Sequence, residues 1–304
     1  MDLHLLENIV CIADEKSITR AAEKRFVTQS ALNQQLQKLE EELGTPLFIR
    51  ARSNWKPTEA GEIYLNAARN MLLMKKDAYA QIADRAEKIS RQMTVGLITE
   101  RGVDMFTAIY PAFRREYPQV RVEPVECNVR TMQRMITAGQ LDLGLATLDE
   151  RQRDDNYYHV MAEEEILLAA PADHPLAEGG GRDYRLAPET DLARFADMPF
   201  VRIYQRSTLF SITEALFEEA GFTPRELFST SSNLSKRRIV SLGLGCALLP
   251  AVYAVEEEGA VYFRLKGLPR WQITMCSRKG GYLGKAEQYY LDLCRGYWRD
   301  RLSR

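Results

Sequence analysis

The chain lacks the features of membrane-spanning, secreted and metal-dependent proteins. It has no run of 18 or more apolar residues, so we expect no membrane span. Its amino terminus has no basic stretch and no small-residue cleavage site, so we expect no secretory signal and a cytoplasmic protein. The five cysteines form no CxxC pair and the three histidines are far apart, which argues against a disulfide framework and predicts no metal site.

The chain also lacks the excess of basic residues that nucleic-acid-binding surfaces often have. Its net charge is −1, and residues 1–60 hold eight basic and nine acidic side chains. Hydrophobic residues make up 45% and charged residues 27% of its 304 residues, which is ordinary for a globular protein of two or more domains. Any case for DNA binding must therefore rest on where the charges lie.

Three short helices are predicted in the first 45 residues. Asp2, Ser17 and Thr28 each precede a stretch with apolar residues at three- and four-residue spacing, as helix caps do. Gly44 follows the third helix, where a left-handed stop is expected. Residues 47–57 have no helical period and suit a two-stranded wing.

The third helix begins with short polar side chains opposite an apolar face. In a helix-turn-helix the second helix of the motif lies in the major groove, where amides can pair with adenine. A solvated helix face is the alternative, and the basic wing favours DNA. The predicted DNA-contacting residues are Thr28, Gln29, Ser30, Asn33, Gln34, Lys38, Arg50, Arg52 and Lys56.

A long helix without proline is predicted over residues 59–89, on the order of 45 Å in length. An apolar seam with near-heptad spacing runs along its second half, interrupted by Lys75. A dimer seam is favoured, and packing on its own domain is the alternative. The seam consists of Leu72, Tyr79, Ile82, Ala86 and Ile89.

From Met93 onward, short apolar runs alternate with helical stretches. This alternation predicts an α/β fold with a parallel, doubly wound sheet. The acidic run Glu163–Glu165 is interpreted as solvated. The predicted domains are a winged helix-turn-helix domain (1–58), a linker helix (59–89) and an α/β domain (90–304).

The segment SITRAAEKRFVTQSALNQQLQKLEEELGTPLFIRARSNWKPTEAG resembles the DNA-binding signature of LysR-type transcriptional regulators. The resemblance implies a winged helix-turn-helix. Members of that family usually carry Ser and then Arg where this chain has Asn33 and Gln34, so we expect a preference leaning toward A·T-rich half-sites.

Weaker resemblance extends through FRREYPQVRVE, AGQLDLGLAT, PADHPLA and SLGLGCALLP. It implies an effector domain similar to a two-lobed periplasmic binding protein. Lobe one would be about 93–163 and 267–304, and lobe two about 164–266. It also implies a homodimer, paired into a homotetramer, on double-stranded promoter DNA with two-fold symmetry, with RNA polymerase as a further candidate partner. No cofactor is expected beyond a small-molecule effector.

In such a domain a ligand lies beyond strand ends and against helix starts. We expect a small carboxylate there rather than a cation, although Glu100 would repel an anion or bind an amine. Ordinary helix capping is the alternative role for the hydroxyl and amide groups. The predicted effector-contacting residues are Thr99, Glu100, Arg101, Asn128, Arg130, Thr131, Thr147, Gln205, Arg206, Ser207, Thr208, Ser231 and Asn233.

Two other classes of protein remain as alternatives. An α/β enzyme with a helical extension would need a catalytic motif, and the chain has no GxSxG, P-loop or HExxH sequence. A ligand-independent architectural DNA-binding protein would leave more than 200 residues unexplained. The sequence therefore predicts a DNA-binding transcriptional regulator, not an enzyme, that responds to a small-molecule effector.

Overall fold

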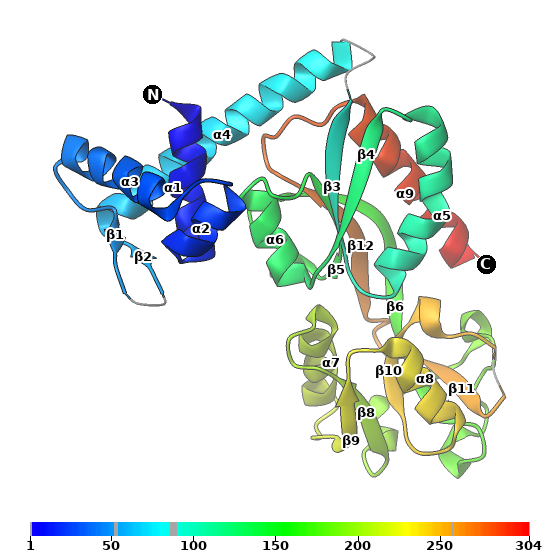
Figure 1. The fold of residues 1–304 in the computed structure, drawn as a ribbon. Coiled ribbons are helices and arrows are strands. Elements are labelled where there is room, and N and C mark those ends of the chain that lie inside the picture. The colour runs from blue at the N-terminus through cyan, green and yellow to red at the C-terminus, as the bar shows by residue number, and fades with distance from the viewer. Residues whose placement is uncertain (1, 52–53, 86–89, 257, 304) are drawn as a thin grey trace. The chain divides into compact units, whose positions relative to one another are not determined.

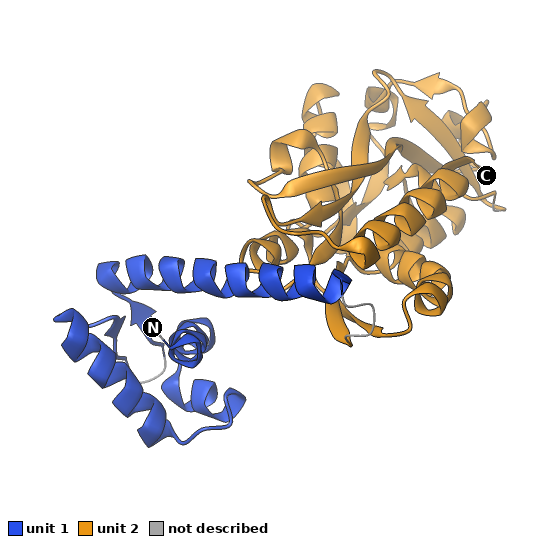
Figure 2. Ribbon diagram, turned by 90° about the horizontal axis from the view of Figure 1, so that it is seen from above, with its two compact units in different colours: residues 1–87 blue, residues 88–304 orange. Residues whose placement is uncertain are grey.

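The computed structural model describes residues 2–51, 54–85, 90–256 and 258–303. The chain forms two compact units, residues Met1–Glu87 and Lys88–Arg304, which Figure 2 draws in different colours. No helix within these described ranges has the length and apolar character that crossing a membrane requires.

Unit 1 has the helices and the wing that the sequence predicts. The side chains of Asp2, Ser17 and Thr28 each accept a backbone hydrogen bond at a helix start, and Gly44 takes the left-handed conformation at the end of the third helix. The elements are α1 (Leu3–Glu15), α2 (Ile18–Lys24), α3 (Gln29–Leu43), β1 (Phe48–Ile49), β2 (Lys56–Pro57) and α4 (Glu59–Arg85).

Helix α4 is tied to α1 by packing and by two ion pairs. Leu65 and Ala68 are buried in this unit. The Arg69 guanidinium lies 2.8 Å from Asp14, and Lys75 lies 3.1 Å from Glu7. Lys75 therefore faces its own unit, which explains why it interrupts the apolar seam.

Unit 2 is built on an eight-stranded sheet with the order β4-β3-β5-β12-β6-β11-β7, in which β10 also pairs with β6. A separate sheet joins β8 and β9 (Figure 1). The strands are β3 (Arg91–Leu97), β4 (Val120–Glu126), β5 (Leu143–Leu148), β6 (Tyr157–Pro171), β7 (Glu189–Thr190), β8 (Pro199–Ile203), β9 (Arg225–Thr230), β10 (Ala247–Pro250), β11 (Ala260–Leu265) and β12 (Arg270–Ser277).

The prediction of a parallel, doubly wound sheet is wrong in part. Strands β3, β4 and β5 pair in parallel, as do β8 and β9, but β6 and β12 run antiparallel to their neighbours in the large sheet. One cause is β6, whose 15 residues run through the acidic stretch that was interpreted as solvated. Residues 157–165 of β6 pair with β12, and residues 166–171 pair with β10 and β11. We keep the names lobe one and lobe two for the parts of unit 2 that these two stretches of β6 join.

The helices cover the sheets and supply the cores. The α-helices are α5 (Arg101–Glu116), α6 (Val129–Thr137), α7 (Thr208–Glu219), α8 (Asn233–Ser241) and α9 (Lys285–Ser303). Short 3-10 turns are η1 (Glu150–Gln152), η2 (Pro175–Ala177), η3 (Tyr184–Leu186), η4 (Leu192–Phe195) and η5 (Ala251–Tyr253).

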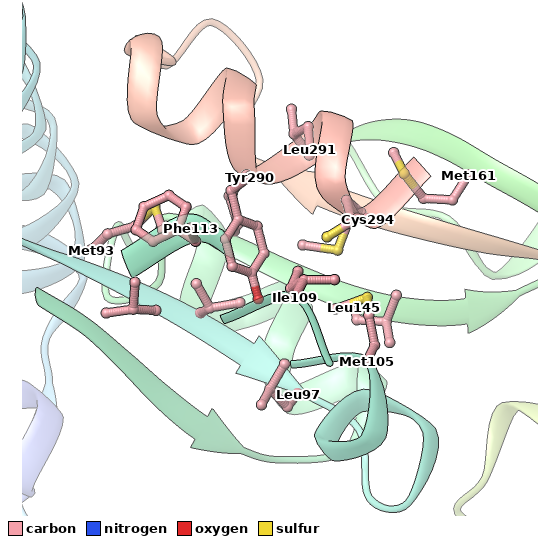
Figure 3. Packing of buried hydrophobic residues seen from close by; sticks show 14 of the residues in the cluster. Met93, Leu97, Met105, Ile109, Phe113, Leu145, Met161, Tyr290, Leu291 and Cys294 are labelled. Atoms are coloured by element: carbon pink, nitrogen blue, oxygen red, sulfur yellow. The ribbon is translucent and has the colours of Figure 1, made fainter. Parts of the chain in front are cut away.

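Helix α9, which the sequence did not predict, completes the core of lobe one. Figure 3 shows Tyr290, Leu291 and Cys294 of α9 facing Phe113 and Ile109 of α5 across the cluster. The Arg91 guanidinium binds both carboxylate oxygens of Glu287 at 2.6 and 2.8 Å, which ties β3 to α9. The carboxyl-terminal helix is therefore an integral part of this lobe.

The interpretation of the acidic run as solvated is wrong for Glu164. Its side chain is fully buried and accepts hydrogen bonds from Arg101 Nη1 at 2.7 Å, Trp271 Nε1 at 2.8 Å and the backbone N–H of Val252 at 2.7 Å. Strand alternation is the cause, because residue 164 points to the opposite face from its neighbours. Glu163 keeps 54% of its side chain exposed.

Replacing Glu164 with alanine should destabilise the protein by about 3–5 kcal/mol, since it leaves the buried Arg101 without a countercharge. The matched change Glu163→Ala, one residue away, should alter the free energy of unfolding by less than about 0.5 kcal/mol. Urea unfolding of both variants measures the difference. Equal effects would mean that Glu164 is not buried as described.

Candidate functional site

The start of α3 presents a polar surface. Thr28, Gln29, Ser30 and Gln34 are exposed, Asn33 is half-buried, and Lys38 is exposed further along the helix. Thr19 Oγ1 of α2 donates to Gln29 Oε1 at 3.1 Å, so the amide nitrogen of Gln29 stays available to another partner. The sequence analysis did not single out Thr19.

The wing is braced by Arg50, whose guanidinium lies 2.5 Å from Glu40 and stacks on Trp55 at 5.6 Å. Arg50 therefore has a structural contact in addition to any phosphate contact. Lys56 is exposed on β2. Arg52, a predicted DNA-contacting residue, lies outside the residues that the structure describes.

Helix α4 exposes large apolar side chains away from α1. Tyr79 and Ile82, two of the predicted seam residues, are 62% and 55% exposed, and Leu72 is half-buried. Ala86 and Ile89 lie outside the described residues.

A cavity of about 260 Å³ lies between the two lobes of unit 2. Its lining combines polar groups with apolar side chains, as small-molecule sites do. The lining residues are Ile98, Thr99, Glu100, Arg101, Cys127, Asn128, Val129, Thr147, Ile203, Tyr204, Arg206, Ser207, Thr208, Leu209, Ser231, Asn233, Tyr253 and Trp271. Ten of the thirteen predicted effector-contacting residues are among them.

Four helices begin at this cavity, namely α5, α6, α7 and α8. Their amino termini carry free N–H groups and the positive end of the helix dipole. Asn128 and Ser207 cap α6 and α7, so part of the predicted ligand-binding capacity of their side chains is already used. Helix α5 has no side-chain cap at Glu100, whose backbone takes the left-handed φ of 64°. At the start of α5 the backbone N–H of Gly102 instead donates to the Ile98 carbonyl at 3.1 Å.

Arg101 is buried at the wall of the cavity, between aromatic rings. Its guanidinium lies 5.1–5.8 Å from the ring centres of Tyr253, Trp271 and Trp298. Nη1 binds Glu164, whereas the buried Nη2 has no hydrogen-bond partner among the described residues. A buried donor without a partner is costly.

Several predicted residues have other roles in the structure. Thr208 Oγ1 donates to the Thr147 carbonyl at 2.7 Å, a hydrogen bond between the two lobes. Arg130 lines a neighbouring cavity of about 420 Å³. Thr131 and Gln205 are absent from the lining of the first cavity, and the backbone N–H of Thr131 is bound by Asn128.

The sequence analysis missed the aromatic and buried basic groups around the cavity. Tyr253 and Trp271 reach it from η5 and β12, which carry no motif. Lys236 lies behind Asn233 on α8 and is 1% exposed. A lysine next to two arginines in a helical stretch resembles a solvated residue, so only the fold reveals its burial.

Comparison with known families identifies both units. Residues 3–62 match the bacterial regulatory helix-turn-helix protein, lysR family, and residues 86–299 match the LysR substrate binding domain. The chain belongs to the LysR family of bacterial transcriptional regulators. This LysR-type protein is a DNA-binding regulator with a domain for a small-molecule effector, which removes the enzyme and architectural alternatives.

Relatives cover nearly the whole chain of this LysR-type regulator. The Hca operon transcriptional activator HcaR of Escherichia coli is 29% identical over 288 residues, covering 92% of this chain and 93% of HcaR. A full-length OxyR variant from Pseudomonas aeruginosa has a TM-score of 0.66 at 22% identity, covering 98% of this chain and 95% of OxyR. CbnR complexed with its target DNA has a TM-score of 0.54 at 18% identity, covering 97% of this chain and 99% of CbnR.

Proposed function

We propose that this LysR-type regulator senses a small anionic metabolite, most simply a carboxylate, in the cavity between the lobes. The observation that carries the proposal is the convergence of four helix amino termini on a cavity whose lining also includes Arg101 and Arg206. Arg206 adds a side chain without an ion pair or hydrogen bond to the described residues. The cavity is small beside the roughly 300–1,000 Å³ of typical ligand sites, so the effector is a small molecule.

A thiol-based response to peroxide is less well supported, although the OxyR relatives include a hydrogen peroxide-inducible genes activator of Escherichia coli. The thiolate is the reactive form of cysteine, and burial disfavours it. Burial raises the pKa of Cys246 and Cys276 to about 12, and it raises the pKa of Cys294 as well. Cys127 lines the cavity, but burial raises its pKa too.

A carboxylate effector should stabilise the full-length protein in a thermal-shift screen of metabolites. At a hundredfold excess over its dissociation constant the gain is about 2.7 kcal/mol. Arg206→Ala should weaken binding at least tenfold by removing a charge-assisted hydrogen bond, and Arg225→Ala, a matched change on exposed β9, should not. Hits that are amines and depend on Glu100 would overturn the anion proposal.

The DNA-reading surface of the proposal is the start of α3 together with the wing, in contact with promoter DNA of two-fold symmetry. Gln29→Ala or Asn33→Ala should lower the preference for the specific site over unrelated DNA by about 1–3 kcal/mol, because amides discriminate bases. Gln288→Ala removes an exposed amide from α9 and serves as the control. Competition footprinting on a promoter fragment measures the preference. If both α3 variants discriminate as the wild type does, another surface reads the DNA.

The proposal includes a homodimer through the exposed apolar face of α4, with a homotetramer formed by further pairing and RNA polymerase as a later partner. A two-fold dimer reads half-sites about 34 Å, or a multiple of that, apart. The face is supported by the exposure of Tyr79 and Ile82 on a helix whose other side is already packed on α1.

Ile82→Asp should break this pairing, because a charge at an apolar seam is not compensated. Ile63→Asp, at a residue of α4 that is 69% exposed but lies off the seam, should leave the assembly intact. Sedimentation velocity of both variants distinguishes them. A dimer that survives Ile82→Asp would place the interface elsewhere.

A further inference from the structure

The cavity has a buried lysine directly behind its wall. We propose that Lys236 is a positioning residue that turns the amide nitrogen of Asn233 toward an anionic ligand, and that it takes up a proton from solvent when that ligand binds. This inference rests on the proposed effector cavity.

The hydrogen bonds of Lys236 fix the orientation of Asn233. Lys236 Nζ donates to Asn233 Oδ1 at 3.3 Å and to the Leu248 carbonyl of β10 at 2.5 Å. Lys236 Nζ is the donor in both hydrogen bonds, so the oxygen of Asn233 faces it. The other end of this amide, the nitrogen Nδ2, makes no hydrogen bond to the described part of the chain. Because Asn233 lines the cavity, its two N–H groups are available to an acceptor there.

The same contacts match the neutral amine. An ammonium group has three N–H donors, whereas Lys236 has two acceptors among the described residues, the number that a neutral amine with two N–H groups uses. Burial agrees with this count, since it lowers the pKa of Lys236 from 10.5 to about 7, with the Glu100 carboxylate acting in the opposite direction.

Among the charged groups around Lys236, the Glu100 carboxylate is the one that affects the pKa of its amine. From α5 it is faced by Glu100, a cavity residue. From β8 it is faced by Arg202, whose charge is paired with Glu214 of α7 and Glu226 of β9. From β10 it meets only a backbone carbonyl.

An anion beside Asn233 would add a second negative charge to that of Glu100. It would raise the pKa of Lys236 above 7, so the bound state would hold more protons than the free state between the two midpoints. By linkage, binding of an anion tightens as the pH falls from about 8 to 7. A cation would lower the pKa of Lys236 instead, so its binding would weaken as the pH falls below about 7.

The test is the titration of Lys236 in the full-length protein labelled with ¹³C-lysine. The Cε resonance that is lost in Lys236→Met belongs to Lys236. If Lys236→Met folds poorly, Lys236→Arg provides the same assignment. In sodium chloride we expect a midpoint near 7, far below that of the exposed lysines. Sodium acetate at equal ionic strength should raise this midpoint by about half a unit or more.

Asn233→Asp is the discriminating variant, because a carboxylate in place of the amide should hold Lys236 charged at pH 8 and abolish the response to acetate. The proposal is overturned if Lys236 titrates near the ordinary lysine value of 10.5, or if acetate leaves its midpoint where chloride does. A footprint that responds to a metabolite while the midpoint stays fixed would overturn the role of Lys236 and leave the regulator proposal standing. A midpoint that moves while no metabolite alters the footprint would support the role of Lys236 and overturn the proposal that this cavity senses an effector.

Discussion

The buried ion pair of Arg101 and Glu164 is the interaction on which the ligand-binding unit depends. Removing two charges from water is costly, and the cost is offset only if the remaining donors and acceptors are satisfied. Glu164 meets that condition with three hydrogen bonds, from α5, β12 and η5. Arg101 meets it only in part, since aromatic rings surround its guanidinium and Nη2 has no partner within the described residues. The pair therefore holds together elements of both lobes at the wall of the cavity.

In unit 1 a comparable constraint acts on α4. One side of this helix is fixed to α1 by buried apolar side chains and by two ion pairs, so it cannot rotate to bury its other side. The large apolar residues on that other side stay exposed within this chain, and only another surface can cover them. The position of Lys75 follows from the same constraint, because it belongs to the packed side and not to the seam.

Most elements could be predicted from the periodicity and the capping residues of the sequence. Both patterns depend on residues that are close together along the chain. The caps at Asp2, Ser17 and Thr28 and most of the cavity-lining loops are of this kind. The course of β6 was not predictable in this way, since three consecutive glutamates resemble a solvated loop and only pairing with β12 places Glu164 inside. The burial of Lys236 has the same origin, as it depends on β10 and on the start of α5. Charged residues that distant parts of the chain bury are the ones that local patterns misplace.

The arrangement of the cavity also says what an effector must do to regulate. Thr208 and Thr147 already join the lobes by a hydrogen bond, and Gln152 donates to the Thr208 carbonyl at 3.0 Å, so the lobes have contacts without any ligand. A ligand that bound equally well to every arrangement of the lobes would change none of their populations. The donors available to a ligand come from both lobes. The start of α5, which has no side-chain cap, belongs to lobe one, and Asn233 and Arg206 belong to lobe two. An anion that accepts from both sets at once favours the arrangement that brings them together, and that difference in binding is what couples the cavity to the rest of the regulator.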